Sequence, residues 1–463
     1  MNYPVWDVPI LGGGMVVAII AIIHILISHF AVGGGAFLLI AELWSDRQPD
    51  GERVRKWLHK FATFFLVYTT VFGAMTGVGI WFAIQLASPE GTSLLIHQFV
   101  FGWAIEWVMF LCELTVLYLY YYGWHSNSRR LQIWLAGLYF AIAWGSLVVI
   151  NGILTFMLTP GGWTLANQDI VAGFFNPGYL PSLLIRTVVM FLLAGLGALM
   201  IASFIKDGAL KERIVVFAAK WVVPCAAASP FLFYWYGTTL PQNTVDLLAG
   251  GITGVGGGRM EVISIFFGVL VVAGALLVIG NMVYLWKPRA VTFTAALAMF
   301  LTAQLGIMGA EFSREMARKP YVIYDTLYSN GLWKHQAKKA DYLGQSYLGL
   351  VRWQPDLVPL GDRHGEFVFR LQCASCHTRY GYRQLASRTE DWSGAFGYKW
   401  LGSMHEQGVM PPFTGNGDDR AALTSYVMSL SGKVVSPPEI LSDVAAEKPA
   451  VVAPGKAPAE VVR

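Results

Sequence analysis

Long apolar runs dominate the first two thirds of the chain. Each has about twenty residues or more, the length that an α-helix needs to cross the hydrocarbon core of a bilayer. The runs cover residues 12–43, 57–86, 97–123, 131–158, 181–205, 214–240, 260–285 and 291–314. This pattern predicts an all-α fold, a polytopic bundle of about eight membrane-spanning helices.

Beyond residue 315 polar and apolar positions are mixed, and this change predicts the domain organisation. Residues 1–315 form the membrane domain and residues 316–360 an extracytoplasmic connector. Residues 361–432 form a small helical domain, considered below. Residues 433–463 are rich in Ala, Pro, Val, Lys and Glu and contain no aromatic residue, a composition typical of a disordered tail.

The composition supports a membrane location. Hydrophobic residues make up 55% of the chain and charged residues only 13%, about half the charged fraction of a soluble globular protein. The net charge of +4 comes mostly from the loops and indicates no nucleic-acid partner. The first residues, MNYPVWDVPILGGG, lack a basic segment, so we expect no cleavable signal peptide.

Basic residues in alternate loops predict the orientation. The link after the first run, SDRQPDGERVRKWLHK, is rich in Lys and Arg, as are SNSRR, KDGALKER and WKPR after the third, fifth and seventh runs. The other loops, ASPEGTSLL, TPGGWTLANQDIVAGFFNPGY and PQNTVDLLAGGITGVGGG, contain neither residue. The positive-inside rule places the four basic loops in the cytoplasm. The N-terminus and residues 316–463 are then expected on the periplasmic side of a bacterial cytoplasmic membrane.

The strongest chemical motif lies in the polar C-terminal part, in LQCASCHTRY. The spacing Cys373-x-x-Cys376-His377 is that of a c-type haem attachment site, in which both thiols bond to the haem and the histidine ligates the iron. Half of a zinc site is the alternative, but no second pair of ligands follows. Met410 in HEQGVMPPF is the expected second axial ligand, the alternative being a loop methionine that packs on the core.

With these motifs, residues 361–432 resemble a class I cytochrome c domain. The order is a helix before CxxCH, loops, a Met-Pro loop and a closing helix, DDRAALTSYVMSL. Covalent haem c is attached outside the cytoplasm, which agrees with the orientation that the loops predict. The other two cysteines, Cys112 and Cys225, lie in apolar runs and are expected to pack as small apolar residues.

The nine histidines of the chain exclude two classes of membrane cytochrome. Haem-copper oxidases need an adjacent pair among their liganding histidines, and no His-His pair occurs here. The cytochrome b of quinol–cytochrome c reductases needs two histidine pairs at a fixed spacing on two helices, and this pattern is absent as well.

Ionisable residues inside the apolar runs define a candidate site. In the predicted topology His24, Glu106, Arg186 and Glu311 fall in the outer half of the membrane. Glu113 lies deeper, about two helical turns from Glu106 on the same face. Imidazole and carboxylate groups can ligate haem iron, and an arginine can pair with haem propionates.

These residues also have structural interpretations. His24 can be a core histidine at a helix interface, Arg186 can extend to the outer surface, and the two glutamates can be a hydrogen-bonded pair at a subunit contact. His29 lies about 140° around the helix from His24. We expect a structural role for His29, with a replacement haem ligand as the alternative.

Four short segments together resemble subunit I of the cytochrome bd oxygen reductases, over roughly residues 15–325. They are HILISHFAVGGGAFLLIAE, AIEWVMFLCELT, VINGILTFMLTP and GAEFSREMARKP. The resemblance implies that His24 holds a haem of the oxygen-reducing pair and that Glu106 lies at the oxygen-reducing haem. It also implies that Glu113 carries protons from the cytoplasm and that Glu311 ligates the high-spin haem b.

The chain departs from this family where quinol is oxidised. Arg186 in LLIRTVVM replaces the histidine that ligates the low-spin haem, and Phe266 in EVISIFFGVL stands where the family has a methionine. The long quinol-binding loop is reduced to PQNTVDLLAGGITGVGGG, and the haem c domain takes the place of the ninth helix. We therefore expect electrons to arrive from a periplasmic donor through haem c.

Together these expectations describe a bd-type oxygen reductase subunit. It would reduce oxygen to water at a membrane haem pair, with haem c, haem b and, as a further candidate, haem d. The expected partners are the lipid bilayer, a second membrane subunit resembling cytochrome bd subunit II, and a periplasmic cytochrome or other redox protein. The alternatives are a b/c-type electron-transfer subunit without oxygen reduction, and a reductase of another small acceptor such as nitric oxide.

Overall fold

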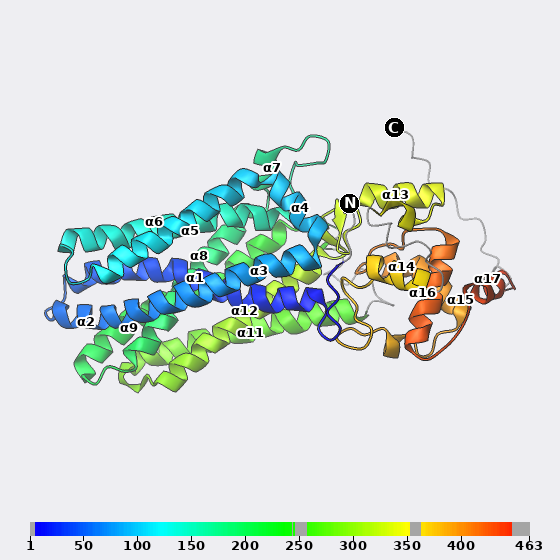
Figure 1. Cartoon of the computed structure of the whole chain (residues 1–463). Coiled ribbons are helices and arrows are strands. Elements are labelled where there is room, and N and C mark those ends of the chain that lie inside the picture. Colours follow the sequence, from blue (N-terminus) through cyan, green and yellow to red (C-terminus); the bar gives the residue numbers. More distant parts are fainter. Residues whose placement is uncertain (1–4, 243, 246–256, 352–362, 447–463) are drawn as a thin grey trace.

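The computed structural model describes residues 5–242, 244–245, 257–351 and 363–446. Eight helical segments of this described part are long and apolar enough to cross a membrane (Figure 1). They are Gly13–Ser45 (α1), Gly51–Ala87 (α2, η1 and α3), Val100–Tyr122 (α5), Arg129–Phe156 (α6), Tyr179–Ala202 (α8), Gly208–Thr238 (α9), Phe267–Trp286 (in α11, Gly257–Trp286) and Phe293–Arg318 (α12). The predicted all-α bundle with about eight spans is confirmed.

The second span is not one uninterrupted α-helix. α2 (Gly51–Val67) and α3 (Gly73–Ala87) are joined by a π-helical turn, η1 (Tyr68–Phe72). Two short helices, α4 (Pro89–Gln98) and α7 (Ile170–Phe174), lie at the end of the bundle nearer the C-terminal region (Figure 1). A 3₁₀ turn, η2 (Pro288–Ala290), connects α11 to α12.

Asp207 caps the first turn of α9. Its side chain accepts hydrogen bonds from the N–H groups of Ala209 and Leu210 at 2.9 and 3.0 Å, two of the donors that a helix leaves unpaired at its start. It also accepts a hydrogen bond from Arg53 at 2.7 Å. The backbone bond from Leu210 and the bond from Arg53 lower the pKa of Asp207 to about 2, so this cap stays ionised at neutral pH.

Ion pairs between the basic loops hold them together at one end of the bundle. The pairs are Arg53–Asp207 at 2.7 Å, Arg213–Asp50 at 2.6 Å, Arg129–Asp46 at 2.8 Å and Arg289–Glu212 at 3.2 Å. Each exposed pair contributes about 1 kcal/mol or less to stability. The pairs show that all four basic loops lie at the same end of the bundle. Figure 1 shows the start of α1 and the C-terminal region at the opposite end.

α1 contacts α2, α3, α6, α8 and α12 and lies at the centre of the bundle. Three consecutive glycines of α1 each approach a different helix so closely that a side chain would not fit. A Cβ added to Gly33 would lie 1.9 Å from the Met190 carbonyl oxygen of α8, one on Gly34 2.2 Å from the Phe65 ring of α2, and one on Gly35 2.4 Å from the Tyr139 ring of α6. The glycine run therefore serves close helix packing.

Large apolar side chains face outward on α5 and α11. Phe101, Trp107 and Trp286 are 78%, 61% and 81% exposed. Apolar surface of this extent is typical of a face that contacts lipid or another membrane subunit.

The chain beyond α12 forms short elements. A small antiparallel hairpin of β1 (Tyr321–Ile323) and β2 (Leu327–Tyr328) is followed by α13 (Lys334–Leu343) and η3 (Tyr347–Leu350). The description resumes at residue 363, and the elements that follow are α14 (His364–Gln372), η6 (Ala386–Arg388), α15 (Gly394–Ser403), η7 (Met404–Gln407) and α16 (Gly417–Leu430). α14 and α16 cross so closely that a Cβ on Gly365 would lie 2.0 Å from the Ala422 carbonyl oxygen.

Residues 433–446 differ from the disordered tail expected for 433–463. α17 (Pro437–Ala446) packs on α15 and α16, and Ile440 is fully buried beside Tyr398 and Ala421. Val444, one turn after Ile440, packs against the same cluster. The apolar residues are few, but their helical spacing gives them a common face. Residues 447–463 lie outside the described residues.

We predict that Gly33→Ala destabilises the bundle by about 1–3 kcal/mol, because the new methyl group has to displace the α8 backbone at Met190. Gly274→Ala in α11 is the matched control, since a Cβ there meets no atom within 4 Å. Alanine favours a helix over glycine by about 1 kcal/mol, so the control should be neutral or stabilising. Denaturant unfolding in detergent measures both variants, and equal stabilities would contradict the packing role of Gly33.

Candidate functional site

The CxxCH motif forms a helical turn directly after α14. The N–H groups of Cys376 and His377 donate to the Cys373 carbonyl oxygen at 3.1 and 2.9 Å. Positions i, i+3 and i+4 of a helical turn share one face, so the turn brings both thiols and the imidazole to the same side. Both cysteines are free and partly buried.

The environment of His377 favours a neutral imidazole that can ligate a metal. Its Nδ1 lies 2.9 Å from the Arg383 carbonyl oxygen, and because a carbonyl only accepts, Nδ1 carries the proton and Nε2 keeps its lone pair. Burial lowers the pKa of His377. Burial also raises the pKa of the Cys373 thiol to about 12. The turn thus presents the protonated thiol of Cys373 and one unprotonated ring nitrogen of His377.

The loop that carries Met410 is tied to the end of α14. The buried Gln372 side chain donates to the Thr414 carbonyl oxygen at 2.6 Å and accepts from the Thr414 N–H at 3.0 Å. Cys373, the next residue, and Met410 both pack against the same apolar cluster. The structure therefore brings the CxxCH turn and the Met-Pro loop, about forty residues apart in sequence, to one core.

A second polar group lies between α1, α8 and α12. His29 of α1 is only 3% exposed, and His24, Arg186 of α8 and Glu311 of α12 are close enough to act on it electrostatically. Its Nδ1 donates to the Ile25 carbonyl oxygen at 2.8 Å, so this bond does not use Nε2. Four residues singled out from the sequence are thus brought together.

His24 and His29 face different neighbours. The Thr76 hydroxyl of α3 donates to the Phe72 carbonyl oxygen at 2.7 Å, and it lies 2.9 Å from His24 Nδ1. Since the hydroxyl proton is already used, Nδ1 of His24 donates to Thr76 and Nε2 has the lone pair. His24 therefore faces α3 while His29 faces α8 and α12, as their separation of about 140° around α1 predicts.

Glu311 has a partner that the sequence analysis overlooked. Arg314, one turn later on α12, donates to Glu311 Oε2 from Nε at 2.9 Å and from Nη2 at 2.7 Å. Both bonds end on Oε2, so this pair does not occupy Oε1. The signal was present in GAEFSREMARKP as an acid and a base at i and i+3.

Two buried guanidinium N–H groups near this site have no hydrogen-bond partner among the described residues. They are Nε of Arg186, which is 8% exposed, and Nη1 of Arg314. Leaving a buried charged donor unpaired costs more than the about 1–3 kcal/mol of a neutral one, so such groups usually have an acceptor. The group around His29 therefore has two N–H donors available for an additional anionic or hydrogen-bond-accepting ligand.

Glu106 and Glu113 form a separate acidic pair on α5. They lie within electrostatic range of each other and both are partly buried. Glu113 is also within range of the buried Tyr139 of α6. The Tyr139 hydroxyl donates to the Ala31 carbonyl oxygen of α1 at 3.3 Å, so Glu113 lies on the side of α5 that faces α6 and α1.

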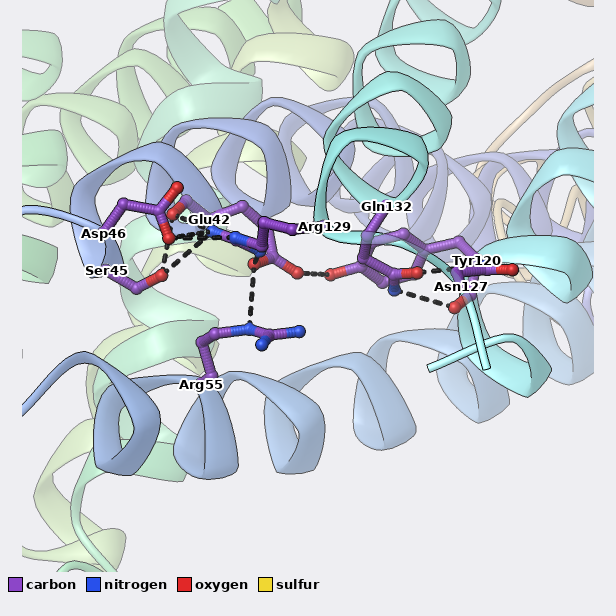
Figure 2. A network of polar contacts seen from close by, with 8 residues as sticks. All are labelled: Glu42, Ser45, Asp46, Arg55, Tyr120, Asn127, Arg129 and Gln132. Carbon is purple, nitrogen blue, oxygen red and sulfur yellow. Dashed lines mark hydrogen bonds and ion pairs between the residues drawn. The ribbon is translucent and has the colours of Figure 1, made fainter. Parts of the chain in front are cut away.

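A buried network at the basic end of the bundle, shown in Figure 2, was not predicted from the sequence. Glu42 of α1 is 0% exposed. It pairs with Arg129 of α6 and with Arg55 of α2 at 3.6 Å, and accepts a hydrogen bond from the Tyr120 hydroxyl of α5 at 2.8 Å. One carboxylate thus links four helices. The sequence carried little signal, because a glutamate near the end of an apolar run is typical of the membrane interface.

Fold and site define a class: a multi-pass helical membrane protein with buried and partly buried histidines, carboxylates and arginines between its spans. Within this class, the bd oxidase from Geobacillus thermodenitrificans has a similar fold, with a TM-score of 0.59 at 17% sequence identity. The match covers 68% of this chain and 88% of that chain. No model of a protein family and no curated protein matches the sequence. The chain therefore has the fold of a bd oxidase.

We predict that Glu42→Gln destabilises the protein by about 2–3 kcal/mol. Removing one partner of a fully buried ion pair costs about 3–5 kcal/mol, and the loss is smaller here because Arg129 and Arg55 are 29% and 31% exposed. Glu52→Gln is the control, since Glu52 and its partner Lys56 are 82% and 74% exposed and such pairs contribute little. Equal unfolding free energies for the two variants would show that the Glu42 network does not stabilise the helix bundle.

Proposed function

We propose that this chain is the oxygen-reducing subunit of a bd-type oxidase that receives its electrons at a covalent haem c. One observation carries the proposal: a chain with the bd oxidase fold combines a CxxCH turn with histidines, arginines and a glutamate buried between its spans. Oxygen would be reduced to water in the outer half of the membrane, with protons taken from the cytoplasm.

The CxxCH turn and its surroundings fit haem c. Cys373 and Cys376 would form the two thioether bonds, and His377 would ligate the iron through the Nε2 lone pair that its bond to Arg383 leaves available. Met410, held in the same core, would be the second protein ligand of the iron. Haem c bound here would supply a one-electron carrier on the periplasmic side.

The residues around His29, between α1, α8 and α12, fit a haem and its propionates. His24, His29, Glu311 and Glu106 are the candidate iron ligands, and haem b and haem d are the candidate cofactors. Arg186 and Arg314 would donate their unpartnered N–H groups to haem propionates. This requirement for an acceptor is the observation that supports a bound group in place of a purely structural ion pair.

Glu113 and Glu106 would carry protons towards that site. Glu113 lies nearer the end where the basic loops gather, and Glu106 lies about two turns farther from that end on the same helix. Chains of acids inside membrane spans commonly carry protons. The buried Tyr139 beside Glu113 would help to keep this side chain on the inner side of α5.

Electron input would differ from that of quinol oxidases. Arg186 stands where a low-spin haem ligand is expected, and the short loop in place of the quinol-binding loop lies largely outside the described residues. A periplasmic cytochrome or other redox protein would reduce haem c. The exposed apolar faces of α5 and α11 would contact lipid and a second membrane subunit resembling cytochrome bd subunit II.

A second candidate function is an electron-transfer subunit without oxygen reduction. The observation that favours it is the double hydrogen bond from Arg314 to Glu311. A carboxylate held in this way is a weaker iron ligand, and without it the high-spin site would be incomplete.

The proposal predicts one haem c and at least two non-covalent haems in the purified protein. A pyridine haemochrome assay should show that Cys373→Ala with Cys376→Ala removes haem c and leaves the membrane haems. Cys112→Ala with Cys225→Ala is the control, because these thiols lie in membrane spans, and it should keep all haems. A wild-type protein without haem c would refute the proposal.

The two glutamates of α5 should respond differently to substitution. Glu106→Ala is expected to change haem content or the optical spectrum together with activity. Glu113→Ala should keep the haems and slow oxygen consumption by about 100-fold or more, the usual effect of losing a proton-transfer group. Glu113→Asp should retain part of the rate, since a water can bridge the shorter side chain. Normal turnover in both alanine variants would favour the electron-transfer subunit.

A further inference from the structure

The N-terminal segment, residues 6–14, lies between the membrane bundle and the CxxCH turn. On one side the Trp6 N–H donates to the Leu86 carbonyl oxygen at the end of α3 at 2.9 Å. On the other side the Tyr382 N–H, five residues after His377, donates to the Ile10 carbonyl oxygen at 2.6 Å. Figure 1 shows the N-terminal end of the chain at this junction. The segment therefore contacts both parts through its backbone.

Three glycines make the contact close. A Cβ on Gly381 would lie 2.1 Å from the Ile10 carbonyl oxygen and 2.6 Å from its Cα. A Cβ on Gly14 would lie 3.4 Å from the Ser375 carbonyl oxygen, inside the CxxCH motif. Gly12 has a φ of 74°, a conformation that favours glycine, and a Cβ there would lie 3.3 Å from Thr378. The residues that surround the haem-binding motif thus lie directly on the start of α1.

Charged side chains connect the same two parts. Arg379, two residues after His377, lies 3.7 Å from Asp7 of the N-terminal segment and 3.1 Å from Glu366 of α14. Exposed ion pairs of this kind contribute little to stability individually. Through its two pairs, however, Arg379 joins the N-terminal segment and α14 to the loop after the CxxCH motif.

The CxxCH turn contacts the start of the same helix that carries His24 and His29. α1 begins at Gly13 and carries His24 about three turns, or about 16 Å, farther along the same helix. Electron transfer slows steeply with distance, so a donor needs a fixed position relative to its acceptor. A rigid contact between the CxxCH turn and the first turn of α1 supplies such a position.

We infer that the N-terminal segment and Gly381 are positioning elements for electron transfer: they fix the CxxCH turn on the start of α1, so that haem c bound there would have a set distance from the group at His24 and His29. This inference rests on the proposed function. It assigns a role to the glycines at 12 and 14 and to Gly381, which the haem motif itself does not require.

The test compares two single-methyl substitutions outside the membrane spans. Gly381→Ala pushes a Cβ into the Ile10 backbone, whereas at Gly349 a Cβ meets no atom within 4 Å. Gly381→Ala should keep its haem c by the pyridine haemochrome assay. Hydrogen exchange of the Tyr382 amide should become about tenfold faster or more, and electron transfer from flash-reduced haem c to the membrane haems should slow by at least about tenfold. Gly349→Ala should match the wild type in all three.

Arg379→Gln is a second, milder variant should Gly381→Ala fail to fold, and it should change exchange and transfer rate in the same direction. A wild-type transfer rate in a variant whose Tyr382 amide exchanges faster would overturn the inference and leave the proposed function intact. A wild-type exchange rate of the Tyr382 amide in both Gly381→Ala and Arg379→Gln would also overturn the inference, because the contact would then not depend on these two residues. Absence of haem c from the wild type would overturn the proposed function and this inference together.

Discussion

The close approach of α1 to three neighbours at residues 33–35 is the constraint on which the rest of the structure depends. A methyl group at any of these positions would meet atoms of α8, α2 or α6 at 1.9–2.4 Å. In a bilayer there is little hydrophobic driving force between helices, so close backbone packing has to supply much of the association. Because α1 is held at its middle, both of its ends have defined positions. The half of α1 nearer the C-terminal region, its outer half in the predicted orientation, carries His24 and the contact with the CxxCH turn. His29 lies at the middle of the helix, and Glu42 lies near the opposite, inner end.

The two ends of α1 differ in how their charges are satisfied. At the inner end Glu42 is met by two arginines and a tyrosine, so the network is complete and holds four helices together. At the outer end Arg186 and Arg314 keep buried N–H groups without a partner among the described residues. Buried polar groups inside a membrane protein are costly unless they are paired or functional. This contrast supports a structural role for the Glu42 network and is the physical reason for proposing ligand binding at the group around His29.

The sequence predicted what depends on local periodicity and composition. The eight spans follow from the lengths of the apolar runs, and the common side of the basic loops follows from their Lys and Arg residues. The angle between His24 and His29 also followed, because both lie on one helix. What it did not predict depends on contacts between helices: the pairing of Glu42 with Arg129, the place of His29 beside Arg186 and Glu311, and the contact of the CxxCH turn with the N-terminal segment. The helix α17 was missed because one buried isoleucine, Ile440, is a weak signal in a Pro- and Ala-rich stretch.

The geometry is compatible with the proposed change of electron donor within one fold. The resemblance to cytochrome bd subunit I predicts the quinol-site ligands on the helices that follow α7, where this chain has Arg186 on α8. A domain after α12 approaches from the aqueous side, and the structure places it on the first turn of α1. Since α1 also carries His24 and His29, the proposed donor at the start of α1 would not depend on the residues predicted for quinol oxidation. The central helix fixed by residues 33–35 would then serve as both the packing centre and the route for electrons.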